Sequence, residues 1–223
     1  MPRLNPTSSF WQTPWLNPLN DVVAWNTLLQ GVNPLWSLSE VRARVIGLEW
    51  ECEDVFSLLL KPNRLFKGFQ AGQHVALELE INGVRKTRTF SISNAPTAKG
   101  LLRLTIKINP EGTVSKAASQ LKKGDMVGLS QAAGAFTGDA MNGKALLVSA
   151  GSGITPMMSL LQSWALRASK PDVVLVHTCR REEQLIFGQQ LQTLVHQWPE
   201  LQVQLHFSAA DGHLNAAQLV ERV

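Results

Sequence analysis

Short runs of alternating or β-branched residues fill the chain between residue 39 and about residue 140. Turn-forming pairs such as Asn82-Gly83 and Lys99-Gly100 separate these runs. Short strands in such close succession predict a small closed antiparallel β-barrel, interrupted by one helix over 114–121. The strand-like runs are VRARVIGLEW, DVFSLLLKP, QHVALELEI, VRKTRTFSIS, LLRLTIKI and MVGLSQ.

The hydrophobic period changes from about residue 141 onward. The segment KALLVSA (144–150) is a continuous apolar run, which predicts a strand buried on both faces of a sheet. Helical spacing follows, and strands then alternate with helices, as in βαβ units with a parallel sheet. The expected elements are a helix over 157–165, a strand at 172–178, a helix at 185–196, a strand at 201–207 and a last helix at 214–223.

The first 38 residues form a separate arm that is rich in Trp, Pro and Asn. A short helix is expected over 21–30, with Asn20 as its cap and Gly31 as its end. Its apolar face suits either a membrane or partner surface, or packing on the protein's own domains. The second interpretation is favoured, because the polar face lacks the basic residues of membrane-surface helices. The apolar face consists of Val22, Trp25, Leu28, Leu29 and Val32.

These patterns divide the chain into the arm (1–38), a β-barrel domain (39–140) and a parallel α/β domain (141–223). The 223 residues are 44% hydrophobic and 17% charged, which excludes a disordered chain. No stretch approaches the ~20 apolar residues of a membrane-spanning helix. The start has no apolar core of a secretory signal, so the cytoplasm is the expected location.

Cysteine and histidine usage argues against a metal site. The two cysteines, Cys52 and Cys179, exclude a disulfide framework and an iron–sulfur cluster held by this chain alone. The five histidines show no metal-ligand spacing. No metal is therefore expected.

The first segment with candidate chemistry is Arg88-Thr89-Phe90-Ser91, at the end of a barrel strand. Alternation places Arg88 and Phe90 on one strand face, and Thr89 and Ser91 on the other. An Arg suits a diphosphate, a Phe can stack on a planar ring, and a hydroxyl can bond a ring nitrogen. Taken alone, the tetrapeptide fits a half-solvated strand better than a site.

The second segment, Gly112-Thr113-Val114-Ser115, opens the helix that interrupts the barrel strands. Gly allows close backbone approach, and a helix N-terminus presents free N–H groups to a phosphate. A simple N-cap, with Thr113 or Ser115 serving only the helix, is the alternative, and it is favoured when the segment is taken alone.

The third segment, Gly151-Ser152-Gly153-Ile154-Thr155-Pro156, follows the strand KALLVSA directly and opens a helix. A strand, a glycine turn and a helix are what a dinucleotide-binding crevice requires. Thr155 is expected as the N-cap and Pro156 as the first helical residue. Because Pro156 stands where the usual fingerprint has its third glycine, a purely structural turn is the alternative.

The three segments together resemble the ferredoxin–NADP reductase superfamily, over roughly residues 40–220. That family binds a flavin on a β-barrel through an Arg-x-aromatic-Ser/Thr strand and a Gly-x-x-Ser loop. It binds a nicotinamide cofactor on the following α/β domain through a G-x-G-x-T-P turn. The segment WSLSEVRARV and the Trp-rich arm are similar to bacterial reductases that serve fatty-acyl desaturases and oxygenases.

The resemblance implies a role for each matching residue. Arg88 would hold the FAD diphosphate, Phe90 would lie against the flavin ring, and Thr89 would belong to the same site. Ser91 would face the ring's N5 edge, and Ser91 and Thr155 are the two side chains with an implied catalytic role. Many relatives carry Tyr where Phe90 stands, so one hydroxyl bond to the flavin is lost here. The remaining implied cofactor-binding residues are Thr105, Ile106 and Lys107 by main chain, Gly112, Thr113, Val114 and Ser115 at the diphosphate, and Gly151, Gly153, Ile154, Thr155 and Pro156 at the nicotinamide cofactor.

The preference for NADPH or NADH is expected to depend on Arg180 and Arg181, which follow the second strand of the α/β domain. An Arg there accommodates the 2′-phosphate of NADPH, whereas NAD sites place an acidic residue. A solvated loop with Arg181 paired to Glu182 or Glu183 is the alternative, and relatives with Arg here also use NADH. NADPH is slightly favoured.

Nine basic residues and a single acid, Glu111, lie between Arg85 and Lys123. The segment lacks the interleaved aromatics and the recognition helix of nucleic-acid binders. A basic rim would steer an acidic ferredoxin or flavodoxin, and a solvated face without a partner is the alternative. The basic residues are Arg85, Lys86, Arg88, Lys99, Arg103, Lys107, Lys116, Lys122 and Lys123.

The expected function is therefore FAD-dependent electron transfer from NADPH or NADH to a ferredoxin, flavodoxin or iron–sulfur domain, for a desaturase or oxygenase. A non-catalytic flavin-binding remnant and a ferric-chelate reductase are the alternatives. The resemblance also implies strands beyond the three found after residue 144, and a 2Fe-2S cluster only in a missing C-terminal domain or a partner. A truncated chain is expected, with weak nicotinamide binding and an aggregation-prone sheet edge; a naturally short domain is the alternative.

Overall fold

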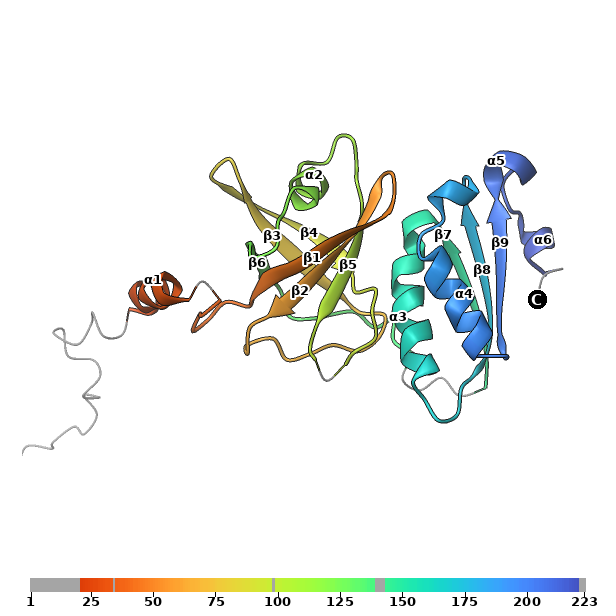
Figure 1. The fold of residues 1–223 in the computed structure, drawn as a ribbon, viewed down its shortest axis with the longest axis horizontal. Coiled ribbons are helices and arrows are strands. Elements are labelled where there is room, and N and C mark those ends of the chain that lie inside the picture. The colour runs from red at the N-terminus through yellow and green to blue at the C-terminus, as the bar shows by residue number, and fades with distance from the viewer. Residues whose placement is uncertain (1–20, 34, 98, 139–142, 221–223) are drawn as a thin grey trace, which may run out of the picture.

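The computed structural model describes residues 21–33, 35–97, 99–138 and 143–220. It contains a six-stranded antiparallel sheet followed by a three-stranded parallel sheet with helices (Figure 1). This order confirms the predicted fold class, an antiparallel β-barrel followed by a parallel α/β domain. No helix in the described part of the chain is both long enough and apolar enough to cross a membrane.

The antiparallel sheet rolls around its own apolar core. Alternate residues of its third strand, Val75, Leu77 and Leu79, point into that core and are buried. A short helix, α2 (Thr113–Ser119), adds Val114 and Ala118 to the same cluster. The six strands are β1 (Arg42–Cys52), β2 (Val55–Pro62), β3 (His74–Ile81), β4 (Val84–Ser91), β5 (Leu102–Lys107) and β6 (Met126–Leu129).

The barrel is split along one seam, so the expectation of a fully closed barrel is wrong in this detail. The strand order is β4-β3-β6-β1-β2-β5, which leaves β4 and β5 as the two edges. The edges meet at an isolated bridge between Ile92 and Leu104, where Ser93 N also donates to Arg103 O at 2.8 Å. The bridge lies directly after β4 ends at Ser91, and β4 itself runs in contact with β5 along the seam.

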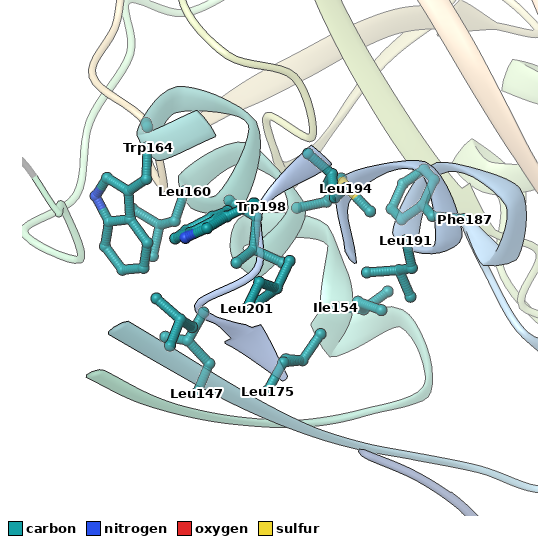
Figure 2. Packing of buried hydrophobic residues seen from close by; sticks show 14 of the residues in the cluster. Leu147, Ile154, Leu160, Trp164, Leu175, Phe187, Leu191, Leu194, Trp198 and Leu201 are labelled. Atoms are coloured by element: carbon teal, nitrogen blue, oxygen red, sulfur yellow. The ribbon is translucent and has the colours of Figure 1, made fainter. Parts of the chain in front are cut away.

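The α/β domain packs two helices on one face of its sheet (Figure 2). Leu147 and Leu175 from the sheet meet Leu160 and Trp164 of α3 and Leu191 of α4 in one buried cluster. The elements are β7 (Lys144–Ala150), the 3₁₀ turn η3 (Gly151–Gly153), α3 (Ile154–Ala165), β8 (Asp172–Cys179), the 3₁₀ turn η4 (Glu182–Gln184), α4 (Gly188–Gln197), β9 (Leu201–Phe207), α5 (Ser208–Asp211) and α6 (Ala216–Val220).

Strand β7 is buried on one face only, which corrects the prediction from its apolar run. Ala145 and Leu147 point into the helix-covered core, whereas Leu146 and Val148 are 44% and 43% exposed on the other face. The order β7-β8-β9 makes β7 an edge strand of the described sheet. Composition alone cannot distinguish a buried strand from an edge strand with apolar residues on both faces.

Helix ends in the α/β domain also differ from the sequence expectations. Helix α4 begins at Gly188 and not at 185, because Phe187 adopts a left-handed backbone with φ of 64°. The expected helix over 214–223 begins at Ala216, and Asn215 Oδ1 accepts from Gln218 N at 2.9 Å. Residues 221–223 lie outside the described part, and the short helix α5 was not predicted.

The arm's helix, α1 (Val22–Val32), is not buried in the domain cores, and the arm before residue 21 lies outside the described residues. None of its residues is buried, and Val32 is 75% exposed. Its cap is Asp21, whose Oδ1 accepts from Val23 N and Ala24 N at 2.9 and 3.1 Å; the expected cap, Asn20, lies outside the described residues. The helix also continues through Gly31, the expected end, and Asn33 is its C-cap.

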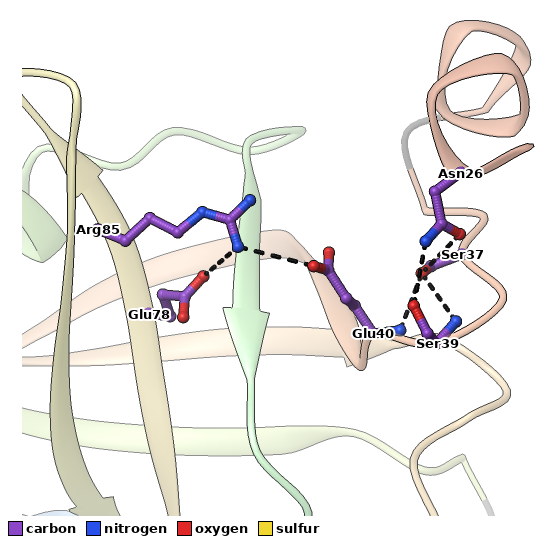
Figure 3. Close-up of polar contacts among 6 residues, drawn as sticks. All are labelled: Asn26, Ser37, Ser39, Glu40, Glu78 and Arg85. Atoms are coloured by element: carbon purple, nitrogen blue, oxygen red, sulfur yellow. Dashed lines mark hydrogen bonds and ion pairs between the residues drawn. The ribbon is translucent and has the colours of Figure 1, made fainter. Parts of the chain in front are cut away.

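Polar contacts connect α1 to the start of the barrel (Figure 3). Asn26 Oδ1 accepts from Leu38 N at 2.7 Å, and Asn26 Nδ2 donates to Ser39 Oγ at 3.0 Å. Next to them, Arg85 Nη1 lies 3.6 Å from Glu40 Oε1 and 3.3 Å from Glu78 Oε1, so two carboxylates already pair with this guanidinium.

Candidate functional site

Strand β4 places Arg88 and Phe90 on the side of the barrel core. Arg88 lies opposite Leu77 and Phe90 opposite Val75 in the β3–β4 register, and opposed residues share a face. Phe90 packs at the margin of the barrel core, while Arg88 is exposed and donates from Nη1 to Thr87 O at 2.9 Å. A flat apolar side chain and an exposed guanidinium thus share one face.

Thr89 and Ser91 face the other side of β4. They lie opposite Ala76 and His74 of β3, as the alternation predicts. Thr89 is exposed and Ser91 is half-buried. A role for the Thr89 side chain on the Arg88 face is therefore not supported by the geometry.

The split seam places β5 opposite these residues. Counting antiparallel from the Ile92–Leu104 bridge sets Phe90 opposite Ile106 and Ser91 opposite Thr105. On its other edge, β5 pairs with β2 through Thr105, Ile106 and Lys107. The seam therefore has main-chain groups on one side and an aromatic residue with a guanidinium on the other.

The side chain of Thr105 is part of a buried row of hydrogen-bonded hydroxyl groups. Its Oγ1 lies 2.8 Å from both Ser57 Oγ and Ser93 Oγ, and Ser57 in turn donates to Glu51. Thr105 is 4% exposed. Only its main chain can therefore face the seam, which is the mode that the resemblance implies. Lys107 pairs with Asp54 at 3.2 Å.

The Gly112–Ser115 loop presents the start of α2 without a side-chain cap. Gly112 is the N-cap and no side chain bonds the first amides, so Thr113 and Ser115 do not serve as helix caps. Ser115 Oγ accepts instead from Asn109 N at 3.0 Å. A Cβ at Gly112 would lie 2.9 Å from Asn109 Cβ. The loop thus needs glycine and leaves N–H groups for an anion.

Lys86 connects this loop to the Arg88 face. Lys86 lies on the same face of β4 as Arg88 and Phe90, because it is two residues before Arg88. Its Nζ donates to Thr113 Oγ1 at 3.4 Å. The structure therefore brings Lys86, Arg88 and the α2 start together as one positively charged corner, which fits a diphosphate. Sequence reasoning did not assign Lys86 to the site, although its parity with Arg88 could have indicated it.

The glycine turn after β7 has open space beside it. Gly151 has φ of 50°, and a Cβ at Gly151 or Gly153 would meet nothing within 4 Å. The turn is a 3₁₀ turn, and α3 begins at Ile154 with Gly153 as its N-cap. A backbone turn with exposed space at both glycines can approach a phosphate closely.

Thr155 is not the N-cap of α3, and Pro156 is not its first residue. Thr155 lies in the first turn, is 6% exposed, and donates from Oγ1 to Ser152 O at 3.0 Å. This bond closes the glycine turn on itself. The hydroxyl is thus a brace of the turn in this structure, and the expectation of a capping role is corrected.

Arg180 and Arg181 follow β8 and are both exposed. Neither forms an ion pair with any residue in the described part of the chain, so the alternative pairing of Arg181 with Glu182 or Glu183 is wrong. Their main chain is fixed, because Arg180 O accepts from Ala209 N at 3.0 Å and Arg181 O accepts from Gln184 N at 3.1 Å. Two free guanidinium groups therefore stand on an anchored turn.

Two thiols and an imidazole lie near these segments, and none is suited to nucleophilic chemistry. Burial raises the pKa of the Cys52 thiol, and burial with the nearby Cys52 charge raises the pKa of Cys179. Burial lowers the pKa of His177 to about 4, and its Nδ1 lies 2.9 Å from Ser149 Oγ. Among the described residues, no three His, Cys, Asp or Glu gather as a metal site would.

The two groups of residues face each other across the domain contact. The barrel supplies the Arg88 strand, β5 and the α2 loop, and the α/β domain supplies the glycine turn. Turn η3 contacts both β5 and β8, and α3 lies on the barrel side of its sheet (Figure 1). The Arg180–Arg181 turn follows the adjacent strand at the same end of the parallel sheet.

Comparisons with known proteins agree with this two-part site. Residues 45–137 match the model of an oxidoreductase FAD-binding domain, and residues 147–218 match that of an oxidoreductase NAD-binding domain. The chain belongs to the ferredoxin–NADP reductase superfamily. The barrel is therefore an oxidoreductase FAD-binding domain, and the α/β part is an oxidoreductase NAD-binding domain.

Three known proteins illustrate the match to this superfamily. An NADPH oxidoreductase of Mycobacterium tuberculosis is 33% identical over 86% of this chain and 52% of its own length. A glycine betaine monooxygenase reductase subunit of Pseudomonas aeruginosa is 32% identical over 67% of this chain and 41% of its own. The FAD/NAD-binding domain of a Vibrio cholerae nitric oxide dioxygenase is 26% identical, with a TM-score of 0.71 over 80% of this chain and 81% of that one. The chain thus spans about half the length of these curated relatives or less.

Proposed function

We propose that this reductase takes electrons from NADPH, passes them through FAD, and delivers them to an acidic ferredoxin, flavodoxin or iron–sulfur domain that serves an oxygenase or desaturase. The observation that carries the proposal is the seam between β4 and β5, which faces the glycine turn across the domain contact. Relatives named as an NADPH oxidoreductase and as a monooxygenase reductase subunit support the direction of electron flow.

Each part of the site has a task in this proposal. Bound FAD supplies the capacity to take two electrons together and to release them singly. Phe90 supports the flavin ring, and Ser91 and the β5 main chain orient its polar edge. Arg88, Lys86 and the uncapped start of α2 neutralise the diphosphate. The chain's own groups therefore bind and orient, and none needs to act as a general base.

Thr155 and the two glycines position the nicotinamide cofactor. Thr155 braces the turn that presents Gly151 and Gly153. The free guanidinium groups of Arg180 and Arg181 suit a 2′-phosphate, so the proposal specifies NADPH over NADH. The Arg181→Ala variant should lose most of that preference.

The acceptor is proposed to dock on the basic barrel surface. Arg85, Lys107 and Arg103 are engaged within the protein, which leaves a smaller rim than the sequence indicated. The remaining rim would still steer an acidic carrier, and its reduction should slow as salt rises. We place the reaction in the cytoplasm, where reducing conditions keep thiols such as Cys52 and Cys179 free. The rim residues are Lys99, Lys116, Lys122 and Lys123, because Lys86 and Arg88 belong to the diphosphate site.

Anaerobic titration of the purified protein with NADPH tests the proposal. The protein should be yellow with FAD and should bleach faster with NADPH than with NADH. Arg88→Ala should weaken FAD binding about tenfold or more, since charge-assisted hydrogen bonds contribute roughly 1.5–3 kcal/mol, whereas Arg64→Ala on the exposed surface should not. Colourless protein that FAD cannot reconstitute would indicate a non-catalytic remnant. Reduction of ferric chelates but of no protein carrier would exclude the proposed acceptor.

A further inference from the structure

Arg103 of β5 reaches from the barrel to the α/β domain. Its Nη1 donates to Gln190 Oε1 in α4 at 2.9 Å. Its guanidinium carbon also lies 4.6 Å from the ring centroid of Phe187, the residue directly before α4. Phe187 is 2% exposed and holds a left-handed backbone. One side chain therefore contacts the start of α4 by a hydrogen bond and by a cation–π interaction.

The barrel fixes the same guanidinium from the other side. Arg103 Nε donates to Ser93 Oγ at 3.0 Å, and Nη2 donates to Ser93 O at 2.7 Å. The backbone N–H of Arg103 donates to Asn94 Oδ1 at 2.7 Å. The guanidinium of Arg103 therefore donates to both domains at once, which fixes the conformation of the side chain. The single ammonium group of a Lys could not form the same set of hydrogen bonds.

Burial and charge agree with a structural contact and not with a surface ion pair. Burial lowers the pKa of Arg103, and the charges of Glu51 and Glu49 oppose that change. No acidic side chain in the described part of the chain lies within ion-pair distance of it. The guanidinium remains charged and is held by carbonyl, hydroxyl and amide oxygens.

Further hydrogen bonds extend the contact along α3. Gln162 Nε2 donates to Gln190 Oε1 at 3.1 Å, and Gln162 Oε1 accepts from Ala95 N at 3.3 Å. Ser159 Oγ donates to Asn94 O at 2.8 Å. The segment 93–95 is thus docked on α3 and α4 directly after β4 ends.

We propose that Arg103 is a positioning residue that clamps α4 to the β4–β5 seam and so sets the spacing between the flavin and the nicotinamide cofactor. Ser93 lies two residues after Ser91, and Arg103 lies two residues before Thr105, so the clamp adjoins both edges of the seam. The inference rests on the proposed function for the reaction, while the clamp itself rests on the contacts alone. Misplacing reacting groups by about 1 Å can cost ~100-fold in rate.

The test compares Arg103→Met and Arg103→Lys with Gln190→Leu, which removes the α/β partner, and with Arg64→Met as an exposed control. FAD affinity, the saturating rate of anaerobic flavin reduction by NADPH, and solution X-ray scattering are measured for each. We expect FAD affinity within twofold of the original and reduction roughly 100-fold slower, with a larger radius of gyration, for all three clamp variants. The Arg64→Met protein should match the original in every measurement.

Two results would overturn the clamp. One is an unchanged radius of gyration in both Arg103→Met and Gln190→Leu. The other is a loss of FAD affinity that parallels the loss of rate, because Arg103 would then act on the flavin site itself. If NADPH fails to reduce the unsubstituted protein, the proposed function fails, and scattering still decides whether Arg103 holds the domains together. Because Gln190 lies outside the barrel, its variant gives that answer even if Arg103→Met does not fold.

Discussion

His177 shows how one buried side chain couples folding to pH. It lies in the middle sheet strand β8, is 0% exposed, and its Nδ1 shares a hydrogen bond with Ser149 Oγ, two residues before the glycine turn. Burial lowers its pKa from 6.5 to about 4. Between these two pH values His177 is protonated in the unfolded chain but stays neutral in the folded protein. The folded state therefore loses stability as the pH falls from 6.5 toward 4.

The prediction is that His177→Leu flattens the pH dependence of unfolding in this window. The imidazole should cost up to ~3 kcal/mol of the free energy of unfolding by pH 4, since one pKa unit corresponds to 1.36 kcal/mol. Urea unfolding at several pH values between 6.5 and 5 measures the slope before most carboxylates protonate. His196→Leu, on the exposed face of α4, should retain the original slope; equal slopes in the original and His177→Leu proteins would contradict the assignment.

Residue types at the candidate site could be read from the sequence, but their individual geometry could not. Alternation correctly separated Arg88 and Phe90 from Thr89 and Ser91. The hydrogen bond from Thr155 to Ser152 forms because the glycine turn is a 3₁₀ turn and Thr155 is not the N-cap. The amino-acid sequence of the turn is compatible with either arrangement. Capping depends on backbone angles within a few residues, which composition does not fix.

At the scale of elements, the α2 loop is the sharpest test of the barrel's part of the site. We predict that Gly112→Ala weakens FAD binding, because the new methyl group would lie 2.9 Å from Asn109 Cβ and 3.1 Å from Ser115 Oγ. The loop must then shift, and the first amides of α2 move with it. Equilibrium titration of the apoprotein with FAD should show an affinity loss of about tenfold, the equivalent of ~1.4 kcal/mol.

Gly47→Ala provides the matched control, because a Cβ at Gly47 would meet nothing within 4 Å. Its position in β1 is remote from the α2 loop in the sheet register, so FAD affinity should stay unchanged. Equal FAD affinity in Gly112→Ala and the original protein would show that the loop does not contact the cofactor.

Element types were predictable because strand alternation and helical spacing are strong local signals. The strands β7 and β9 begin and end where the sequence indicated, and the barrel strands differ by a residue or two at their ends. Helix α4 starts late because Phe187 takes a left-handed conformation that no propensity scale favours for Phe. Contacts with Arg103 and with the buried core hold it there, and such long-range contacts are invisible to local patterns.

At the scale of the whole molecule, the domain interface is the part that the sequence did not reveal. Arg103 was counted only as one charge of a basic rim, although it joins Ser93 to Gln190 across two domains. Val55 and Ala71 of the barrel belong to the same buried cluster as Phe187 and Trp164. Pairings between residues about a hundred positions apart arise from topology, which the sequence indicates only through the order of the domains.

The outer face of β7 is apolar and exposed. Leu146 and Val148 form adjacent exposed apolar positions on a strand that is an edge of the described sheet, and Val174 of β8 lies beside them, in register with Leu146. Helices α3 and α4 cover only the opposite face (Figure 1). An exposed apolar edge strand is a template for pairing with another chain, so association between copies is expected to begin here.

We predict that the double substitution Leu146→Thr with Val148→Thr slows aggregation of the purified protein several-fold without unfolding it. Thr keeps the β-branched shape that strands favour and replaces exposed methyl groups by hydroxyls, so the free energy of unfolding should change by less than about 1 kcal/mol. Light scattering during incubation measures the aggregation rate, and thermal unfolding checks the fold. Leu166→Thr is the control, because Leu166 is 72% exposed at the end of α3 but belongs to no strand edge. If it slows aggregation as much as the double substitution does, general surface hydrophobicity, and not the β7 edge, drives association.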